Sequence, residues 1–137
     1  MLKSFATLAL LAAPLMGQMS VKWEHDLETA LKRAKAEGKP LFVDVWAEWC
    51  PPCQFLKQKI FPTPEATTAL LGYVPVSLMV QHKDRTPVKG NENVTERFKV
   101  TAFPTLIVLD ANGKELRREV GAFSTGAELA AWLRAEK

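Results

Sequence analysis

The spacing of hydrophobic residues after residue 20 predicts helices and strands that follow one another along the chain. Apolar residues recur every three or four positions over residues 23–37, which predicts an amphipathic helix that ends at Gly38 and Pro40. Residues 41–46 are almost all apolar, as in a strand that is covered on both faces. Only Asp44 interrupts this run, so the strand carries one ionisable group in an apolar setting.

The middle of the chain continues this alternation. Helical spacing over residues 50–60 begins at a pair of cysteines, and Pro51 and Pro52 stand in a first turn, where residues without an N–H group are tolerated. A short helix is predicted over residues 64–71, and residues 74–80 form a second apolar strand. The order up to this point is helix, strand, helix, strand.

A polar segment separates the second strand from the third. Residues 81–90 predict a loop, and Asn91 or Asn93 is expected to begin a short helix that reaches Phe98. Residues 106–109 then form a third apolar strand.

The C-terminal part predicts a hairpin and a last helix. Asn112-Gly113 is typical of a two-residue hairpin turn, so residues 115–120 are expected to return antiparallel to the third strand, at an edge of the sheet. Thr125 and Glu128 have the spacing of a capping box in front of a final amphipathic helix.

These elements indicate an α/β protein with a central mixed, mainly parallel sheet and helices on both faces. The 137 residues, of which 47% are hydrophobic, suffice for one core. We therefore expect one domain over residues 21–137, with no internal repeat and no second domain.

The first 20 residues differ from the rest of the chain. Lys3 precedes an almost wholly apolar stretch over residues 5–16, and Gly17, Gln18 and Ser20 follow, which is the order of a secretory signal peptide. The stretch is about a dozen residues long, against the roughly 20 that span a bilayer. The prediction is an exported, periplasmic or extracytoplasmic protein with no clear cleavage site, and a retained N-terminal membrane anchor is the alternative.

Charge gives little indication of a partner. The chain has 18 basic and 15 acidic residues, and loss of the first 20 residues would remove one basic residue, leaving 17 against 15. The sequence contains no basic run with interleaved aromatic residues, so nucleic acid is not an expected partner.

The two cysteines, Cys50 and Cys53, carry the chemistry that the sequence predicts. A structural disulfide stabilises a protein mainly by closing a loop of the unfolded chain, and a loop this short restricts little. Reversible exchange needs an exposed attacking thiolate and a second thiol that resolves the mixed disulfide. Cys50 is expected to attack because the helix start lowers the pKa of its thiol, and Cys53 to resolve because it lies one turn inside.

Three further features near the cysteines leave alternatives open. Burial of Asp44 would raise the pKa of its carboxyl and let it take a proton from Cys53, whereas a solvent-facing or hydrogen-bonded Asp is equally compatible with the spacing. Most X-Pro bonds are trans, so the sequence alone does not predict a cis bond before Pro104. Trp46 and Trp49 are interpreted as packing residues that could also shield the thiols.

Residues 43–53, read as VDVWAEWCPPC, closely resemble the active-site segment of thioredoxins, and Phe103-Pro104-Thr105 resembles their cis-proline segment. The resemblance covers residues 21–137 and implies a thioredoxin-like fold. It also implies that Asp44 is the buried acid near the resolving thiol, that Trp49 flanks the nucleophile, and that Pro104 is cis and faces the disulfide. In that family extended substrate segments pair with the backbone before the cis-proline. The implied substrate-binding residues are Trp49, Pro51, Pro52, Ala102, Phe103 and Pro104.

The chain departs from thioredoxins proper in its Pro-Pro dipeptide, where they carry Gly-Pro, and in its export signal. Residues 61–68 and the long first helix look more like exported thiol:disulfide interchange proteins, including the C-terminal domain of the membrane electron-transfer type. The resemblance implies protein substrates with disulfides or thiols, a membrane electron-transfer partner, a monomer, and no cofactor besides the Cys50-Cys53 disulfide. A reductase is expected, and a disulfide-donating oxidase or an isomerase is the alternative.

Two other functions compete with thiol exchange. The C-x-x-C pair could bind zinc or copper(I) with His25 and His82, but these histidines lack the spacing of a metal site. Haem attachment is excluded because Gln54 follows Cys53 where a His is needed. A chaperone that uses only the cis-proline groove would leave both cysteines unexplained.

Overall fold

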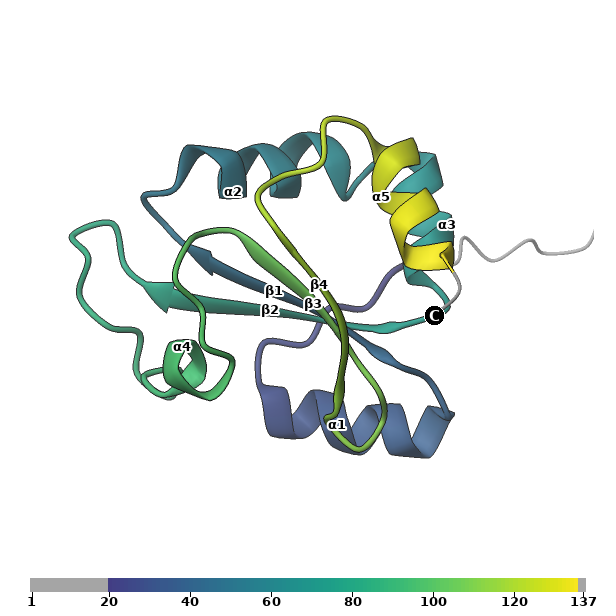
Figure 1. Cartoon of the computed structure of the whole chain (residues 1–137), viewed down its shortest axis with the longest axis horizontal. Coiled ribbons are helices and arrows are strands. Elements are labelled where there is room, and N and C mark those ends of the chain that lie inside the picture. The colour runs from purple at the N-terminus through teal and green to yellow at the C-terminus, as the bar shows by residue number, and fades with distance from the viewer. Residues whose placement is uncertain (1–19, 136–137) are drawn as a thin grey trace, which may run out of the picture.

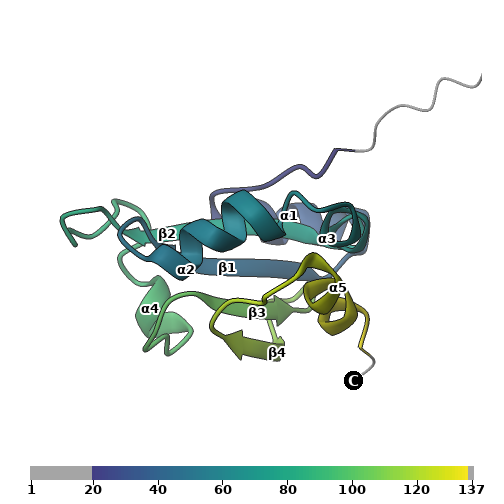
Figure 2. The same cartoon turned by 90° about the horizontal axis from the view of Figure 1, so that it is seen from above.

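A computed structural model of the chain describes residues 20–135, so the predicted signal peptide lies, apart from Ser20, outside the described residues. Four strands form one sheet between two layers of helices (Figures 1 and 2). The elements are α1 (Leu27–Glu37), β1 (Leu41–Ala47), α2 (Pro51–Phe55), the π-helical η1 (Leu56–Ile60), α3 (Pro64–Leu70), β2 (Val74–Gln81), α4 (Val94–Arg97), β3 (Thr105–Leu109), β4 (Glu115–Val120) and α5 (Gly126–Arg134).

The sheet is mixed, as predicted, but the prediction that it is mainly parallel is wrong. The strand order is β2-β1-β3-β4, and only the β1-β2 pair is parallel. Strand β2 ends and β3 begins at the same end of β1, since Gln81 pairs with Ala47 and Thr105 with Val45. The connection between them contains the four-residue α4, which is too short to carry the chain back along the sheet. Strand β3 therefore runs opposite to β1.

Helix α1 begins at Leu27, later than the predicted start at residue 23. Asp26 is the N-cap, and its carboxylate accepts hydrogen bonds from the Thr29 N–H and hydroxyl, both at 2.7 Å. The ring of Trp23 packs against Phe42 and Phe61, with centroid distances of 6.0 and 5.0 Å. The apolar Trp23 thus belongs to the core on the other face of the sheet and not to the face of α1.

The β3-β4 hairpin is confirmed, but its turn is not the predicted two-residue type. The Asp110 N–H donates to the Lys114 carbonyl at 2.8 Å, which leaves three residues in the loop. Gly113 alone in this loop has a positive φ, of 86°, whereas the two-residue turn needs two such residues. The Asp110 carboxylate accepts from the Asn112 and Lys114 N–H groups at 2.9 Å, so it favours the wider loop.

The capping box in front of α5 is confirmed. The Glu128 N–H donates to the Thr125 hydroxyl at 3.1 Å, and the Thr125 N–H donates to the Glu128 carboxylate at 3.3 Å. These two bonds satisfy backbone donors at the helix start that would otherwise have no partner.

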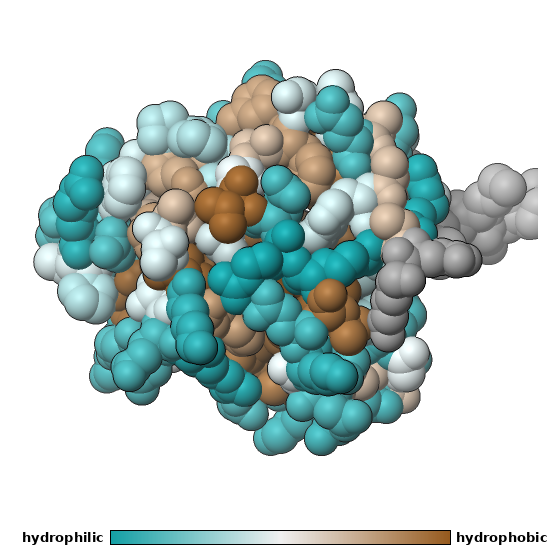
Figure 3. All heavy atoms as spheres, viewed as in Figure 1, coloured by the Kyte–Doolittle hydropathy of each residue, from teal (hydrophilic) through white to brown (hydrophobic). Residues whose placement is uncertain are grey.

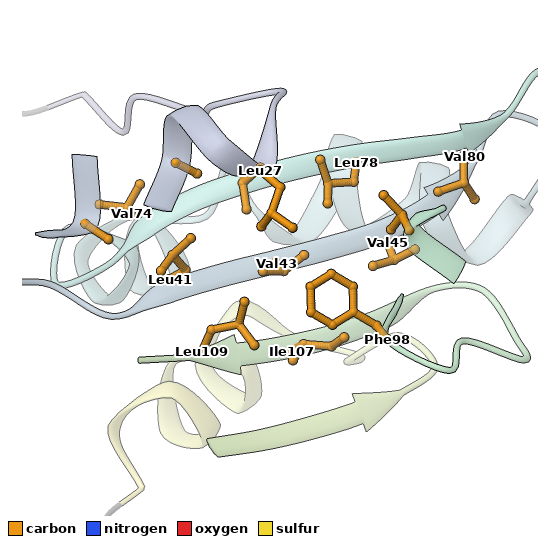
Figure 4. Packing of buried hydrophobic residues seen from close by; sticks show 14 residues of the cluster. Leu27, Leu41, Val43, Val45, Val74, Leu78, Val80, Phe98, Ile107 and Leu109 are labelled. Carbon is orange, nitrogen blue, oxygen red and sulfur yellow. The ribbon is translucent and has the colours of Figure 1, made fainter. Parts of the chain in front are cut away.

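Two hydrophobic clusters lie on opposite faces of the sheet. On the face of α1 and α4, every side chain of the cluster is apolar (Figure 4). On the other face, η1, α3 and α5 pack over Phe42, Leu106 and Val108. Full burial of one such side chain stabilises the fold by about 1.5–3 kcal/mol, so these clusters hold the sheet in place.

The surface is largely polar, and β4 forms an exposed edge of the sheet. On the face seen in Figure 3, hydrophobic residues form separate spots, and hydrophilic side chains cover the middle of the molecule, where β4 lies in Figure 1. Strand β4 carries Glu115, Arg117, Arg118 and Glu119. Among the described residues, no helix combines the length and the apolar character needed to cross a membrane.

Candidate active site

The two cysteines lie at the start of α2 and are joined in a disulfide. Cys50 is the N-cap in an extended conformation, with φ −85° and ψ 111°, and the Cys53 N–H donates to its sulfur at 3.3 Å. Pro51 and Pro52 occupy the first turn, as predicted. Both proline side chains are exposed, at the surface next to the disulfide.

The prediction of an exposed Cys50 is wrong for the disulfide form. Cys50 is 2% exposed and Cys53 is 1% exposed. The side chains of Trp46, Trp49 and Phe103 pack against the pair. A reaction partner therefore meets an apolar rim before it meets the sulfur.

Asp44 is buried in the middle of the sheet, so the solvent-facing alternative is wrong. It pairs with Ser77 of β2 and Leu106 of β3 in the sheet, and it is 1% exposed. Neither carboxylate oxygen has a hydrogen-bond partner among the described residues, so the hydrogen-bonded alternative is wrong as well. Burial raises the pKa of this carboxyl from 3.8 to about 7, against the opposing charge of Lys57.

Lys57 is the nearest counter-charge of Asp44, and the sequence analysis missed it. Its ammonium lies 3.8 Å from the centroid of the Trp46 ring and donates to the Ser77 hydroxyl at 3.3 Å. The indole N–H of Trp46 donates to the same hydroxyl at 2.8 Å. Burial lowers the pKa of Lys57, and the charge of Asp44 opposes this change. Its position four residues after Cys53, one helical turn further on, is the signal that could have found it.

The cis-proline segment lies beside the disulfide. The Phe103–Pro104 bond is cis, as the resemblance implied. Phe103 packs against the cysteine cluster and meets the Trp49 ring edge to face, with a centroid distance of 6.1 Å. Pro104 is buried, whereas Ala102 is exposed and its carbonyl accepts a hydrogen bond from the Thr105 hydroxyl at 2.7 Å.

Trp49 is fixed by two residues that the sequence did not single out. Its indole N–H donates to the side-chain carbonyl of Gln81 at 2.8 Å. The guanidinium of Arg85 lies over the ring, 4.1 Å from its centroid. Both residues are more than 30 positions away in the chain, so no local spacing indicates these contacts.

Two surface grooves, of about 500 and 580 Å³, lie next to Lys57. Both are lined by His25, Lys57 and Ser77, and neither is lined by a cysteine. They bring water close to the lysine that faces Asp44. The disulfide itself lies at the rim formed by the aromatic side chains.

The histidines that could have completed a metal site lie apart from the cysteines. His25 lines the grooves beside Lys57, and the imidazole of His82 lies 3.9 Å from the Glu48 carboxylate. Within residues 20–135, no group of three or more His, Cys, Asp or Glu side chains is arranged to hold a metal ion.

The fold and this site are those of a thioredoxin-like domain with a C-x-x-C disulfide at the start of a helix. A family model described as thioredoxin-like domain matches residues 27–137, and the chain belongs to that family.

The curated relatives are named thiol:disulfide interchange proteins. The chain is 29% identical over 116 residues to thiol:disulfide interchange protein DsbD 2 of Pseudomonas aeruginosa, which covers 83% of this chain and 19% of the relative. It is 35% identical over 91 residues to DsbD of Cronobacter sakazakii, which covers 66% of this chain and 15% of the relative. The chain thus spans less than one fifth of the length of these relatives.

Solved structures share the fold. A DsbH oxidoreductase superposes with a TM-score of 0.73 at 21% identity, covering 95% of this chain and 92% of that chain. A thioredoxin from Thermus thermophilus gives 0.66 at 28% identity, covering 85% and 86%. The oxidised C-terminal domain of DsbD from Neisseria meningitidis gives 0.64 at 19% identity, covering 81% and 96%.

Proposed function

We propose that this protein exchanges its Cys50–Cys53 dithiol and disulfide with proteins outside the cytoplasm, and that it acts as a reductase. The observation that carries the proposal is the disulfide at the start of α2, packed under Trp46, Trp49 and Phe103. The same domain buries the Asp44 carboxyl in β1, which raises its pKa to about 7. A purely structural bridge would need no ionisable group in the core, and burial of one costs stability.

The reaction is a two-electron transfer in two exchange steps. In the reduced protein, the Cys50 thiolate attacks a substrate disulfide, and one substrate sulfur leaves as a thiolate. The Cys53 thiol then loses its proton to the Asp44 carboxylate and attacks the Cys50 sulfur of the mixed disulfide. The substrate departs as a dithiol, and the protein keeps the disulfide.

Asp44 suits this role because its pKa lies close to neutral pH. A carboxyl of pKa about 7 holds its proton part of the time and can both accept one and release it. Lys57 acts as a positioning residue, because its positive charge favours the ionised form of Asp44 without touching the reacting sulfur atoms.

Substrate segments are proposed to bind along the rim beside the disulfide. Trp49 and Phe103 supply an apolar surface there, and Pro51 and Pro52 are exposed next to the sulfur atoms. An extended segment would add main-chain hydrogen bonds at Ala102 and Phe103, beside the cis Pro104.

The reductant is proposed to be a membrane electron-transfer partner, and the disulfide itself is the redox group, with no further cofactor. The names of the curated relatives, thiol:disulfide interchange proteins, support exchange with other proteins. The apolar stretch over residues 5–16 supports export.

The reduction potential of the Cys50–Cys53 couple tests the direction of electron flow. Purified protein is equilibrated with glutathione buffers of known ratio, and free thiols are counted. A value near roughly −270 mV supports a reductase, whereas one near roughly −120 mV makes the protein a disulfide donor.

A cysteine-free variant, with Cys50→Ser and Cys53→Ser, separates exchange from a chaperone function. Loss of all reaction with disulfide substrates supports exchange. Retained protection of an unfolded client by the variant would favour a binding module, and stoichiometric metal in the purified wild type would favour a metal site.

A further inference from the structure

The loop between β2 and α4 ends its first turn with an arginine in an unusual backbone conformation. The His82 N–H donates to the Thr86 carbonyl, and the Arg85 N–H donates to the His82 carbonyl, both at 2.9 Å. The Asp84 carboxylate accepts from the Thr86 N–H and hydroxyl at 3.0 and 2.6 Å. Arg85 has a φ of 69°, which a side chain of this kind rarely adopts. The turn therefore holds a long cationic residue where glycine or asparagine would fit with less strain.

Hydrogen bonds connect this turn to Glu48 and Trp49, which directly precede Cys50. The Lys83 N–H donates to the Glu48 carboxylate at 2.8 Å, and the Glu48 N–H donates to the Gln81 carbonyl at 3.0 Å. The Gln81 side chain in turn accepts from the indole of Trp49. The loop and the beginning of α2 lie at the same end of the molecule in both views (Figures 1 and 2).

The guanidinium of Arg85 lies over the ring of Trp49, the residue before Cys50, 4.1 Å from the ring centroid, and Arg85 is exposed to solvent. Other arginines of the fold pair with carboxylates, as Arg33 does with Glu37 and Arg118 with Glu115. Arg85 has no such ion pair among the described residues, and the neighbouring Asp84 carboxylate accepts its hydrogen bonds from Thr86. The end of the molecule where this loop projects is mainly hydrophilic (Figure 3).

We propose that Arg85 makes the site prefer substrate segments that carry a carboxylate close to the reacting cysteine. A guanidinium fixed by ring stacking keeps donors free for both oxygens of a carboxylate and loses little entropy on binding. Trp49 connects it to the substrate rim, because the same ring also meets Phe103 edge to face. The inference rests on the exchange function proposed above and adds the class of substrate.

The test uses short peptides with one internal disulfide that differ at a single position near the cysteine, which is Glu, Gln or Lys. Pre-reduced protein is mixed with each peptide in a single turnover, and the second-order rate of reduction is measured at low salt. The Glu peptide is expected to react about five- to tenfold faster than the Gln peptide and faster still than the Lys peptide. At 0.5 M salt this ratio should fall to about two.

Variants of Arg85 test whether this residue causes the preference for the Glu peptide. Arg85→Asn keeps a residue that tolerates the left-handed turn, and the Glu to Gln ratio should fall close to one. Arg85→Glu should reverse the preference, so that the Lys peptide becomes the faster one. Lys89→Gln is the matched control, because Lys89 is a cation of the same loop that lines the groove beside Trp46, and it should keep the ratio.

The outcomes separate the two proposals. If no peptide is reduced by the wild type, the exchange function fails, whatever Arg85 does. If Glu and Gln peptides are reduced at equal rates, exchange stands and the inference is overturned. Equal loss of the ratio in Arg85→Asn and Lys89→Gln would also overturn it, because the preference would then belong to the charge of the whole loop.

Discussion

The two faces of strand β1 differ in what they bury. Toward α1, the strand presents Leu41 and Val43, and this face carries only apolar contacts (Figure 4). Toward η1, its alternate positions are Phe42, Asp44 and Trp46. On this side, a carboxyl that has no hydrogen-bond partner within residues 20–135 lies in the same layer as an apolar core. The apolar face of the strand therefore stabilises the fold. On the other face, burial of the Asp44 carboxyl costs stability but provides a group that can accept and release a proton.

Leu41→Ala tests the apolar face and should have the largest effect on stability. The side chain is fully buried, and its removal leaves a cavity, so the free energy of unfolding should fall by about 2–5 kcal/mol. Urea denaturation measures the loss. The exchange rate of the protein that remains folded should not change, and a tenfold slower rate would show that the two faces are not independent.

Asp44→Asn tests the other face, and its effect should depend on pH. The carboxyl is ionised in the unfolded chain above its ordinary pKa of 3.8 but stays protonated in the folded protein up to about 7. The folded state therefore holds the extra proton in this window, and the stability of the wild type should fall as the pH rises from 4 to 7. The free energy of unfolding changes by about 1.4 kcal/mol per pH unit, so its total loss between pH 4 and pH 7 is about 4 kcal/mol at most.

Urea denaturation of the oxidised protein at pH 5 and pH 8 checks this prediction. Asn cannot ionise, so Asp44→Asn should be nearly as stable at pH 8 as at pH 5 and more stable than the wild type at pH 8. The variant should also resolve mixed disulfides more slowly. An identical pH dependence in wild type and variant would contradict the buried carboxyl as its source.

Lys57→Met should change the protonation of Asp44, with a smaller effect than Asp44→Asn. Removal of the positive charge raises the pKa of Asp44 further, since Lys57 lowers it in the wild type. The pH at which exchange reaches half its maximum should move upward, and the rate at pH 7 should fall on the order of threefold. Lys59→Met is the matched control, because Lys59 lies on the same element with an exposed side chain. Equal shifts in both variants would rule out a specific action of Lys57 on Asp44.

Thr125→Ala, remote from both faces of β1, should have the smallest effect. It removes the hydroxyl that caps α5 and should lower the free energy of unfolding by about 1 kcal/mol. The reduction potential should stay the same within error. A change in potential would mean that α5 is coupled to the disulfide.

Most helices and strands could be predicted from the sequence, because hydrophobic periodicity and helix caps are local features. The strand at residues 41–46, the helix after the cysteines and the capping box at Thr125 and Glu128 all lie within a few positions of where they were expected. The predictions of a mainly parallel sheet and of a helix that starts at residue 23 were wrong. Both features depend on contacts with distant segments, such as the packing of Trp23 against Phe61, which no local pattern contains.

The parts of the site that belong to recognisable sequence motifs could be predicted. The cysteine pair and the cis-proline segment lie together as the resemblance implied. The burial of Asp44 could not be decided from its spacing. Lys57 was missed although it lies one helical turn after Cys53, and the contact of Arg85 with Trp49 has no local signal in the sequence. Arg85 meets Trp49 only because the loop after β2 folds back, so its place depends on tertiary structure.

The charges on β4 have a consequence for how the molecule behaves among other chains. A bare sheet edge invites a second chain to add a strand, and that is how many proteins aggregate. Any chain that paired with β4 would have to strip water from Glu119 and disturb the Arg118–Glu115 ion pair. A protein proposed to exchange disulfides with other proteins thereby presents a charged strand, and not an apolar one, at the β4 edge of its sheet.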